Sequence, residues 1–338
     1  MILVTHDAAS RDRVRPVIEA LNADPAGPAE VVLVDNSAGP EGRDLAQSLG
    51  VKLVSRSGGF SDGCNDGVAA STQPVVALLG HDTVPRPGWL PPLIRGLELP
   101  GVGAVIPTIE DGRRPGTFNT SGGYLTYVGL AWVSEHGRPI PENDEVSVVD
   151  FPCGGAMALR RETWDRFRGF RGQYFLYQED SDLGWRLRLA GLSTVRIPDS
   201  RVVHEYEFGR QPNKMFLLER NRVLTVLANY RTHTLVLLVP VLVLTELGVM
   251  LVALRDGWLR QKVEAWRDVW ALRPFIREWR EGVEANRVIG DGAMLRRMGH
   301  RISEMPEISS PAGTVIVDRV LGAYKLLIAP VVSVFDRV

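Results

Sequence analysis

Short apolar runs alternate with longer segments of helical spacing through the first hundred residues. After the first run, apolar side chains recur every three or four positions, as at Val14, Ile18 and Leu21. This spacing predicts a helix over 10–24. The same pattern predicts further helices at 43–50 and 61–71 and strands at 2–5, 31–35, 51–55, 75–79 and 101–109. Short strands that alternate with helices form βαβ units, so we expect an α/β fold with a mostly parallel sheet.

Polar side chains stand at the ends of several predicted strands. Asp35 and Asn36 end the second strand, and His81 and Asp82 follow the fourth. In open α/β sheets, ligands bind outside the carboxyl ends of the strands. Asp35 and Asp82 therefore mark a candidate binding edge, although each is also an ordinary residue with which to begin a turn.

The middle of the chain has a different pattern. Residues 118–132 mix Gly, Thr and aromatic side chains, which is typical of an antiparallel segment or a long binding loop. Residues 146–164 predict a strand, a bend with glycine, a second strand and the start of a helix. A cluster of acids opens the predicted helix in 175–191, and the predicted strand at 193–206 ends near His204.

The last third contains a long apolar segment at 234–254, in which Glu246 is the single charged residue. About 21 residues suffice for a helix to cross a hydrocarbon core of ~30 Å. Pro240 and Glu246 argue against a plain lipid-exposed span, and a buried core helix is the alternative. Basic residues flank the segment on both sides and give no orientation.

Two further C-terminal segments support a membrane-associated region. Residues 258–281 interleave four tryptophans with charged side chains, as an interfacial amphipathic helix does, and 315–335 is a second apolar stretch. We expect a catalytic domain at 1–212 and a helical, membrane-associated region at 213–338. Whether 234–254 spans the membrane or lies in its interface stays open at this point.

Composition narrows the class of protein. The 338 residues are 45% hydrophobic and 23% charged with a net charge of −1, so the chain can bury a large core and shows no general basic surface for nucleic acid. Cys64 and Cys153 are too few for a disulfide framework and show no zinc-site spacing. No glycine-rich GxGxxG or P-loop motif follows the first strand, which disfavours dinucleotide enzymes and P-loop NTPases. The amino terminus reads as a strand rather than a signal peptide.

The polar residues suggest chemistry on a nucleoside diphosphate. A carboxylate at Asp35 can accept hydrogen bonds from a ribose or a base. Asp82 can supply a hard oxygen ligand to a divalent cation, and His204 can be a further ligand if the ion is Mn²⁺. Taken alone, a histidine such as His204 is more often a hydrogen-bonded structural residue.

The segment QEDSD at 178–182 is the most informative cluster. Its acids precede a predicted helix, where Asp180 or Asp182 can simply cap the helix N-terminus. The alternative is that one carboxylate acts as a general base on an acceptor hydroxyl.

Taken together, six segments in this order resemble the family 2 glycosyltransferases, which are inverting enzymes of the GT-A fold. The match covers roughly residues 1–210 and is nearest the bacterial rhamnosyltransferase- and galactofuranosyltransferase-like branch. The segments are VVLVDNS, GGFSDGCNDG, LLGHDTVPRPGWL, FPCGGAMALRRETW, FLYQEDSDLGWRLRLAG and VRIPDSRVVH. The resemblance implies a Rossmann-like, mostly parallel mixed sheet flanked by helices.

The resemblance also implies roles for single residues. Asp180, with Glu179 beside it, corresponds to the catalytic base. Asp82 corresponds to the last acid of the family's DxD-type motif and, with His204, to ligands of Mn²⁺ or Mg²⁺. The implied donor-binding residues are Thr5, Asp35, Asn36, Gly59, Asn65, His81 and Asp82, and the implied acceptor-binding residues are Gly154, Gly155 and Trp185.

Two departures from the family pattern qualify this expectation. Gly80 stands where the DxD-type motif has its first acid, and the QxxRW motif of processive synthases is absent. We therefore expect a single-addition enzyme on the cytoplasmic face of the cell membrane. It would move a sugar, with rhamnose as the first candidate, from a nucleotide donor to a hydroxyl of a lipid-linked or cell-envelope glycan. The alternatives are an inactive membrane scaffold, which Gly80 favours, and a nucleotidyltransferase, which lacks the expected glycine-rich phosphate loop near 5–13.

Overall fold

The computed structural model describes every residue except 38, 205–212, 306–310 and 337–338. The described residues form two compact units. The first takes in Met1–Gly123, Val133–Gly184 and Leu192–Phe208, and the second Tyr124–Trp132, Trp185–Gly191 and Gly209–Val338. The second unit thus includes two short segments from the expected catalytic domain. The expected boundary at 212 lies outside the described residues, and the division there stays a prediction.

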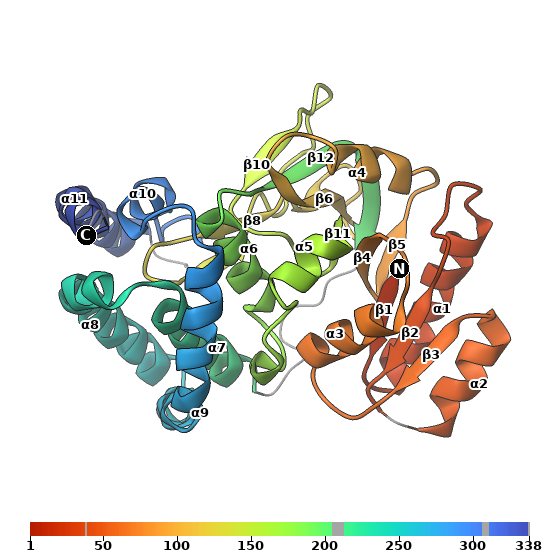
Figure 1. The fold of residues 1–338 in the computed structure, drawn as a ribbon, viewed down its shortest axis with the longest axis horizontal. Coiled ribbons are helices and arrows are strands. Elements are labelled where there is room, and N and C mark those ends of the chain that lie inside the picture. The colour runs from red at the N-terminus through yellow and green to blue at the C-terminus, as the bar shows by residue number, and fades with distance from the viewer. Residues whose placement is uncertain (38, 205–212, 306–310, 337–338) are drawn as a thin grey trace. The chain divides into compact units, whose positions relative to one another are not determined.

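A mixed sheet runs through the first unit (Figure 1). Its strand order is β10–β12–β6–β11–β4–β1–β2–β3, with β5 paired to β12 and β7 paired to β6. The strands are β1 (Ile2–Thr5), β2 (Val32–Asp35), β3 (Lys52–Ser55), β4 (Val75–Gly80), β5 (Thr83–Pro85), β6 (Val102–Asp111), β7 (Phe118–Thr120), β10 (Ser147–Val149), β11 (Ala156–Arg160) and β12 (Ser193–His204). The short strands β8 (Gly123–Leu125) and β9 (Ala131–Val133) pair separately.

Parallel and antiparallel pairs divide this sheet into regions. Strands β3, β2, β1 and β4 are parallel neighbours, as the alternating pattern predicts. Strand β11 then runs antiparallel to both β4 and β6, and β12 runs parallel to β6. The expected α/β class is confirmed, and the five strands predicted in the first 110 residues are all present.

Helices cover both faces of the parallel region (Figure 1). Leu3, Leu33 and Leu79 join one hydrophobic cluster with the buried face of helix α1. The alternate residues point the other way, where α3 packs so closely that a Cβ on Gly67 would lie 2.9 Å from Val34 Cγ2. The helices of this part are α1 (Ala8–Ala23), α2 (Pro40–Leu49), α3 (Phe60–Ala70), α4 (Leu90–Gly96), α5 (Arg161–Arg166) and α6 (Glu179–Leu189), with a short 3₁₀ turn at Gly172–Tyr174.

Helix α1 begins two residues before its predicted start because of its cap. The Asp7 carboxylate accepts a hydrogen bond from the Ser10 N–H at 2.7 Å, and the Ser10 hydroxyl accepts one from the Asp7 N–H at 2.9 Å. This reciprocal capping box satisfies two N–H groups that a helix start otherwise leaves open. It also fixes the turn that follows β1.

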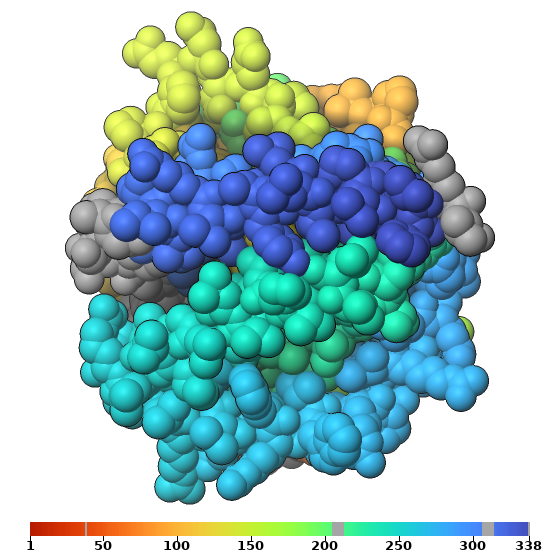
Figure 2. Space-filling model, turned by 90° about the vertical axis from the view of Figure 1, so that its left-hand side faces the viewer, coloured from red at the N-terminus to blue at the C-terminus, as the bar shows by residue number. Residues whose placement is uncertain are grey.

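The second unit is helical in its C-terminal part. Its helices are α7 (Lys214–Asn229), α8 (Thr232–Arg255), α9 (Leu259–Asn286), α10 (Asp291–Arg297) and α11 (Pro311–Phe335). Helix α8 contains the apolar segment 234–254 and is long and apolar enough to cross a membrane by length and composition. Figure 2 shows α11 and α8 side by side along one face of this unit, with α9 next to α8.

Candidate functional site

Three neighbouring parallel strands, β2, β1 and β4, deliver polar residues to one edge of the sheet. Thr5 pairs in register with Asp35 at the carboxyl ends of β1 and β2. Val4 pairs with Gly80 at the end of β4, two residues before Asp82. The sheet register therefore brings the two expected binding carboxylates to the same rim, as the strand pattern predicts.

Asp35 is fully buried and already well bonded. Its carboxylate accepts hydrogen bonds from the Ser37 hydroxyl at 2.8 Å and the Ser37 N–H at 3.2 Å, which is an Asx-turn. The Arg11 guanidinium lies 3.6 Å away, and the buried Thr5 hydroxyl lies 3.4 Å from the same oxygen. Thr5 and Asp35 thus form one buried polar pair beneath the rim.

Asn36, Gly59 and Asn65 connect the neighbouring loops. The Asn36 side-chain amide donates to the Gly59 carbonyl at 2.9 Å. Asn65 exchanges two hydrogen bonds, at 2.8 and 3.0 Å, with the backbone of Phe170. These three expected donor-binding residues hold the start of α3 in place. Both polar groups of the Asn65 side chain are occupied by these hydrogen bonds.

Asp82 and His204 meet directly. Residue pairing of β5 with β12 sets His204 opposite Thr83, and His204 Nε2 lies 3.2 Å from Asp82 Oδ1. The other ring nitrogen, Nδ1, lies 3.2 Å from the side-chain oxygen of Asn119 on β7. Burial acts to raise the pKa of Asp82, but the hydrogen bond and charge of His204 outweigh it and leave that pKa below its ordinary value.

A second histidine lies on the other side of Asp82. His81 Nε2 is 3.9 Å from Asp82 Oδ2, and the His81 ring stacks edge-on against His6 at 5.5 Å between centroids. Burial lowers the pKa of His81 against the attraction of Asp82, so the ring is neutral at pH 7. One carboxylate between two imidazoles is a donor set of the kind that a divalent cation accepts together with phosphate oxygens.

The local structure explains why residue 80 is a glycine. A Cβ at this position would lie 2.7 Å from Thr83 Oγ1 and 3.1 Å from Asp82 Oδ1. The tight turn that presents Asp82 therefore has no room for the acid that the family motif has here.

A short chain of backbone hydrogen bonds links this turn to the acidic cluster. The Gly80 N–H donates to the Gly155 carbonyl at 2.8 Å, and the Gly154 N–H donates to Asp180 Oδ2 at 2.9 Å. Asp180 Oδ1 accepts a second bond from the Ser181 N–H at 2.7 Å. The expected base thus belongs to the same rim as Asp82.

Asp180 and Glu179 are both hard to ionise. Burial raises the pKa of Asp180 to about 6, although the N–H groups of Gly154 and Ser181 oppose the shift. Burial, reinforced by the neighbouring Asp180 charge, raises the pKa of Glu179 well above its ordinary value. Two adjacent carboxyls in one buried site do not ionise together readily, and a pKa of about 6 lets Asp180 carry the charge near pH 7.

The loop before α6 is conformationally unusual. Phe175, Tyr177 and Gln178 have φ angles of 65°, 70° and 67°, a region that non-glycine residues rarely adopt. The Phe175 carbonyl accepts a hydrogen bond from the Ser61 N–H, and a Cβ on Gly59 would collide with that carbonyl. Such strain is concentrated at functional sites, where surrounding contacts hold it.

Trp185 lies in the second unit and is fully buried. Its ring packs edge-on against Tyr230, with 4.8 Å between centroids. A side chain enclosed in this way offers no surface to an acceptor, so the proposed site does not include Trp185.

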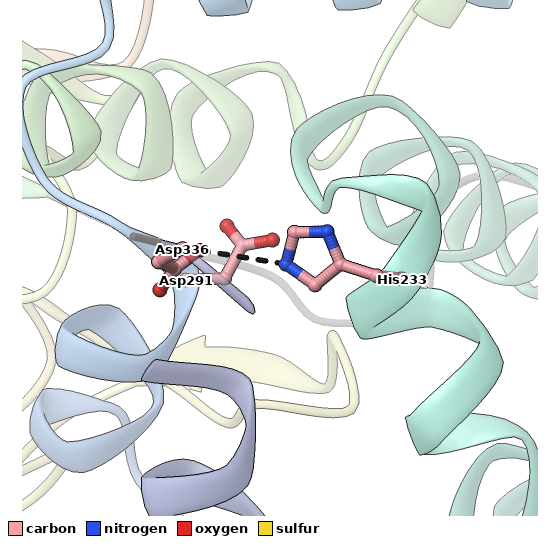
Figure 3. A group of neighbouring side chains, drawn as sticks. All are labelled: His233, Asp291 and Asp336. Carbon is pink, nitrogen blue, oxygen red and sulfur yellow. Dashed lines mark ion pairs between the residues drawn. The ribbon is translucent and has the colours of Figure 1, made fainter. Parts of the chain in front are cut away.

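The second unit contains a separate group of possible metal ligands, His233, Asp291 and Asp336 (Figure 3). Arginines already neutralise both acids: Arg287 lies 2.6 Å from Asp291, and Arg231 lies 3.5 Å from Asp336. The Gly292 N–H also donates to Asp336. This group is better explained as an ion-pair cluster that ties α8, α10 and α11 together.

Comparison with known proteins agrees with the resemblance noted in the sequence. Residues 1–167 match the family model described as Glycosyl transferase family 2. This match takes in 167 of the 338 residues, just under half of the chain. An N-acetylglucosaminyl-diphospho-decaprenol L-rhamnosyltransferase of Mycobacterium tuberculosis is 31% identical over 134 residues, which is 38% of this chain and 41% of that protein. The rhamnosyltransferase WbbL of Escherichia coli is 36% identical over 70 residues, 21% of this chain and 25% of that protein.

The chain thus spans less than half the length of these two curated relatives. Among solved structures, GalNAc-T7, crystallised with UDP, GalNAc and Mn²⁺, is similar with a TM-score of 0.55 and 17% identity. The match covers 68% of this chain and 48% of that chain, and at this identity it bears on the fold alone. The expected GT-A-like fold of the glycosyltransferase domain is confirmed.

The sequence does not predict two features of the candidate site. Asn119, which contacts His204, lies on a three-residue strand in a segment with no clear period. The left-handed residues Tyr177 and Gln178 carry no glycine to signal them. The mixed Gly, Thr and aromatic composition of 118–132 was the one signal that pointed toward Asn119.

Proposed function

We propose that this family 2 glycosyltransferase moves a sugar from a nucleoside diphosphate donor to an acceptor hydroxyl, with inversion at the anomeric carbon. The observation that carries the proposal is the bond from the Gly154 N–H to Asp180, next to the bond that joins Gly155 to the turn of Asp82. A charged base and a diphosphate-binding carboxylate on one rim are what displacement at an anomeric carbon requires.

In the proposed step, Asp180 Oδ takes the proton of the acceptor hydroxyl. The acceptor oxygen forms a bond to the anomeric carbon while the bond from that carbon to the diphosphate oxygen breaks on the opposite face. The leaving diphosphate takes the electron pair, and attack from the opposite side inverts the configuration. Since the pKa of Asp180 is about 6, its carboxylate is ionised at pH 7 and basic enough to assist.

We propose that Glu179 supports the action of Asp180 as the base. Its side chain is 5% exposed, and Oε2 has no hydrogen-bond partner among the described residues. A neutral Glu179 leaves the negative charge on Asp180 and offers an O–H to a bound hydroxyl or water.

Asp82 and His204 are the residues that we propose to hold a divalent cation, Mn²⁺ or Mg²⁺. Their donor atoms already lie 3.2 Å apart at the edge of the site, and carboxylate and imidazole both suit Mn²⁺. When bound, such an ion supplies positive charge beside the departing diphosphate. His81, at 3.9 Å from Asp82, is placed to contact the same phosphates.

The remaining sequence candidates divide into donor and acceptor sides. We propose that Thr5, Asp35, Asn36, Gly59 and Asn65 shape the nucleoside side of the rim. For Asn65 and Asp35 this role is to position the loops, because their polar atoms are already bonded within the protein.

Gly154 and Gly155 form the acceptor side of the proposed site. A Cβ on Gly154 would lie 3.4 Å from Asp180 Oδ2, in the space that an acceptor oxygen has to enter. Glycine therefore keeps the approach to the base open.

The relatives suggest which substrates to test first. The Mycobacterium tuberculosis relative is named as an L-rhamnosyltransferase acting on N-acetylglucosaminyl-diphospho-decaprenol. We therefore propose rhamnose as the first donor sugar and a lipid-linked or cell-envelope glycan as the acceptor. The apolar helix α8 supports a location at the membrane, and a nucleotide-sugar donor supports its cytoplasmic face.

The deciding experiment is a donor screen of the purified full chain. Nucleotide-activated sugars are combined with polyprenyl-diphosphate glycan acceptors, products are detected by mass, and the anomeric configuration is read by NMR. A product with inverted configuration supports the proposal. No transfer and no hydrolysis of any donor, together with no Mn²⁺-dependent binding of nucleoside diphosphates, would instead support the inactive scaffold that the missing acid at Gly80 suggests.

A further inference from the structure

Helix α8 lies at the surface of the second unit (Figure 2), and one face of it is an apolar stripe. Every exposed residue from Val236 to Leu254 in this fully described helix is apolar or glycine. The larger members recur every three or four positions and are 42–68% exposed: Val236, Val239, Val243, Leu244, Leu247, Leu251, Val252 and Leu254. A monomeric soluble surface rarely presents an apolar stripe of this length, so the stripe is expected to have an occupant.

Along one edge of the stripe, α8 is bound to charged groups of the protein. Glu246 pairs with Arg222 on α7 and with Lys262 on α9, the latter at 2.7 Å. The indole N–H of Trp266 donates to the same carboxylate at 2.9 Å. Arg222 and Lys262 are both almost fully buried and the Glu246 side chain is 18% exposed, so most of the Glu246 surface faces protein rather than solvent or lipid.

This network is incompatible with α8 crossing a bilayer. A helix of 24 residues is about 36 Å long, and Glu246 lies about 21 Å from its start, which is deep within the hydrocarbon of a spanning helix. Helices α7 and α9 would have to enter the bilayer as well. They carry buried Glu219 and the ion pair of Arg220 with Asp268, and helix α9 is rich in charge throughout.

The apolar surface continues onto the neighbouring helices. Helix α11 lies beside α8, where the Tyr324 hydroxyl donates to the Leu237 carbonyl, and exposes Ile316, Leu326, Leu327 and Val334. On the other side, α9 exposes Trp266 and Trp270, and the Arg273 guanidinium stacks 4.4 Å above the Trp270 ring. Tryptophan and arginine beside an apolar band are typical of the boundary between acyl chains and phosphate headgroups.

We propose that α8 lies flat in one leaflet of a membrane, with its stripe and the exposed side of α11 in the acyl-chain boundary and Glu246 turned toward the protein. We call this surface the membrane face: the α8 stripe together with Ile316, Leu326, Leu327 and Val334. A bilayer is favoured over a second protein because a stripe without polar side chains offers none of the side-chain hydrogen bonds that a protein interface of this size normally has. The inference deepens the membrane location in the proposed function and rests on it only for which leaflet is involved.

The first test determines whether the two ends of α8 lie on the same side of the membrane. Thr232→Cys and Asp256→Cys place thiols at the two ends of α8, and both positions are exposed. Each full-length variant is labelled with a membrane-impermeant maleimide in right-side-out and in inverted vesicles of the expression host, with the parent chain as background for Cys64 and Cys153. We expect both thiols to react from the same side. Reaction of one thiol in each vesicle type would establish a spanning helix and overturn the proposal.

The second test asks whether the stripe itself binds lipid. Flotation of the purified chain with phosphatidylcholine–phosphatidylglycerol vesicles is compared for Val243→Glu and Val146→Glu. The two valines are 52% and 56% exposed, and Val146 lies in a loop of the first unit, so the pair matches the chemistry and the exposure of the change.

We expect Val243→Glu to weaken vesicle binding about tenfold or more and Val146→Glu to leave it unchanged, because the lost burial of a valine and the exclusion of a charge together amount to about 1.4 kcal/mol or more. Unfolding midpoints without lipid should be equal for the two variants. Equal vesicle binding of both variants would overturn the proposal. Neither test depends on transfer activity, so failure of the proposed reaction and failure of the membrane face give different results.

Discussion

His204 Nε2 lies 3.2 Å from Asp82 Oδ1, although the two residues are far apart in the chain. The register of β5 against β12, which sets His204 opposite Thr83, makes the contact. Asn119 holds the other ring nitrogen and so fixes the orientation of the imidazole. Three elements thus meet to position one imidazole against one carboxylate.

Removal of His204 should weaken metal-linked nucleotide binding. For His204→Ala we expect about a 10- to 100-fold loss in the affinity for a nucleoside diphosphate in the presence of Mn²⁺, with little change in the presence of EDTA. Isothermal titration with and without Mn²⁺ measures both. His300→Ala, in the second unit, is the control. An equal loss with and without Mn²⁺ would assign His204 to structure instead of the cation.

Asp180→Asn should abolish most of the transfer activity and leave donor binding intact. Asparagine has the same shape and keeps one oxygen, which can accept the bond from Gly154 or the bond from Ser181, but it cannot take the proton of the acceptor. General base catalysis contributes roughly 10²–10⁴ to a rate, so kcat should fall by that factor with the donor Kd unchanged. Single-turnover transfer and donor titration on the same preparation check this. Glu179→Gln is the matched neighbour, for which we expect a smaller loss, and equal rates for wild type and Asp180→Asn would exclude Asp180 as the base.

The raised pKa of Asp180 has an opposite effect on activity and on stability. The folded-state pKa of about 6 lies above the ordinary value of 3.8, so the folded protein binds this proton more tightly than the unfolded chain does. The free energy of unfolding therefore falls as pH rises from about 4 to 6, and the full penalty remains above that window. In the same window the base becomes ionised, so kcat should rise with pH and level off above about pH 6.

Asp180→Asn removes this penalty and makes it measurable. We expect the variant to be more stable than wild type by about 1–3 kcal/mol at pH 8 and equal to it at pH 4. Urea unfolding followed at both pH values gives the difference. A variant that is less stable at pH 8 would show that the Asp180 charge is favourably held in the folded protein.

The sequence predicted the parallel half of the sheet and its edge residues. Val14, Ile18 and Leu21 recur at helical spacing and are all buried, because one face of α1 packs against the sheet. Asp35 and Asp82 follow apolar strands, so alternation alone placed both at the carboxyl edge. Single-residue roles came from the resemblance, since no periodicity distinguishes Asp180 from the capping acids beside it.

The remaining features depend on contacts between distant segments. The pairing of β5 with β12 involves three residues on β5 and has no sequence pattern of its own. The sequence therefore does not predict the contact of His204 with Asp82. Tyr177 and Gln178 adopt left-handed φ angles that surrounding contacts impose against local preference. In the sequence, Glu246 is the single charge of an apolar segment. Its partners Arg222 and Lys262 lie on α7 and α9, the helices that precede and follow α8 in the chain.

The glycine at position 80 offers a last test of how the rim is built. A Cβ there would lie 2.7 Å from Thr83 Oγ1, which has no hydrogen-bond partner among the described residues, and 3.1 Å from Asp82 Oδ1. We expect Gly80→Ala to destabilise the fold by about 1–3 kcal/mol, the usual range for overpacking, and to weaken Mn²⁺-linked nucleotide binding by displacing Asp82.

Thr83→Ala removes the hydroxyl that the new methyl group would meet. The double variant Gly80→Ala, Thr83→Ala should therefore recover most of the stability lost in Gly80→Ala, with a coupling free energy of about 1 kcal/mol or more between the two sites. Thermal unfolding of wild type, the two single variants and the double variant gives the coupling free energy. Nucleotide titration with Mn²⁺ shows whether the double variant regains the binding lost in Gly80→Ala. Additive effects would mean that the Thr83 hydroxyl does not set the space at residue 80, and the glycine would then need an explanation other than crowding in the turn of Asp82.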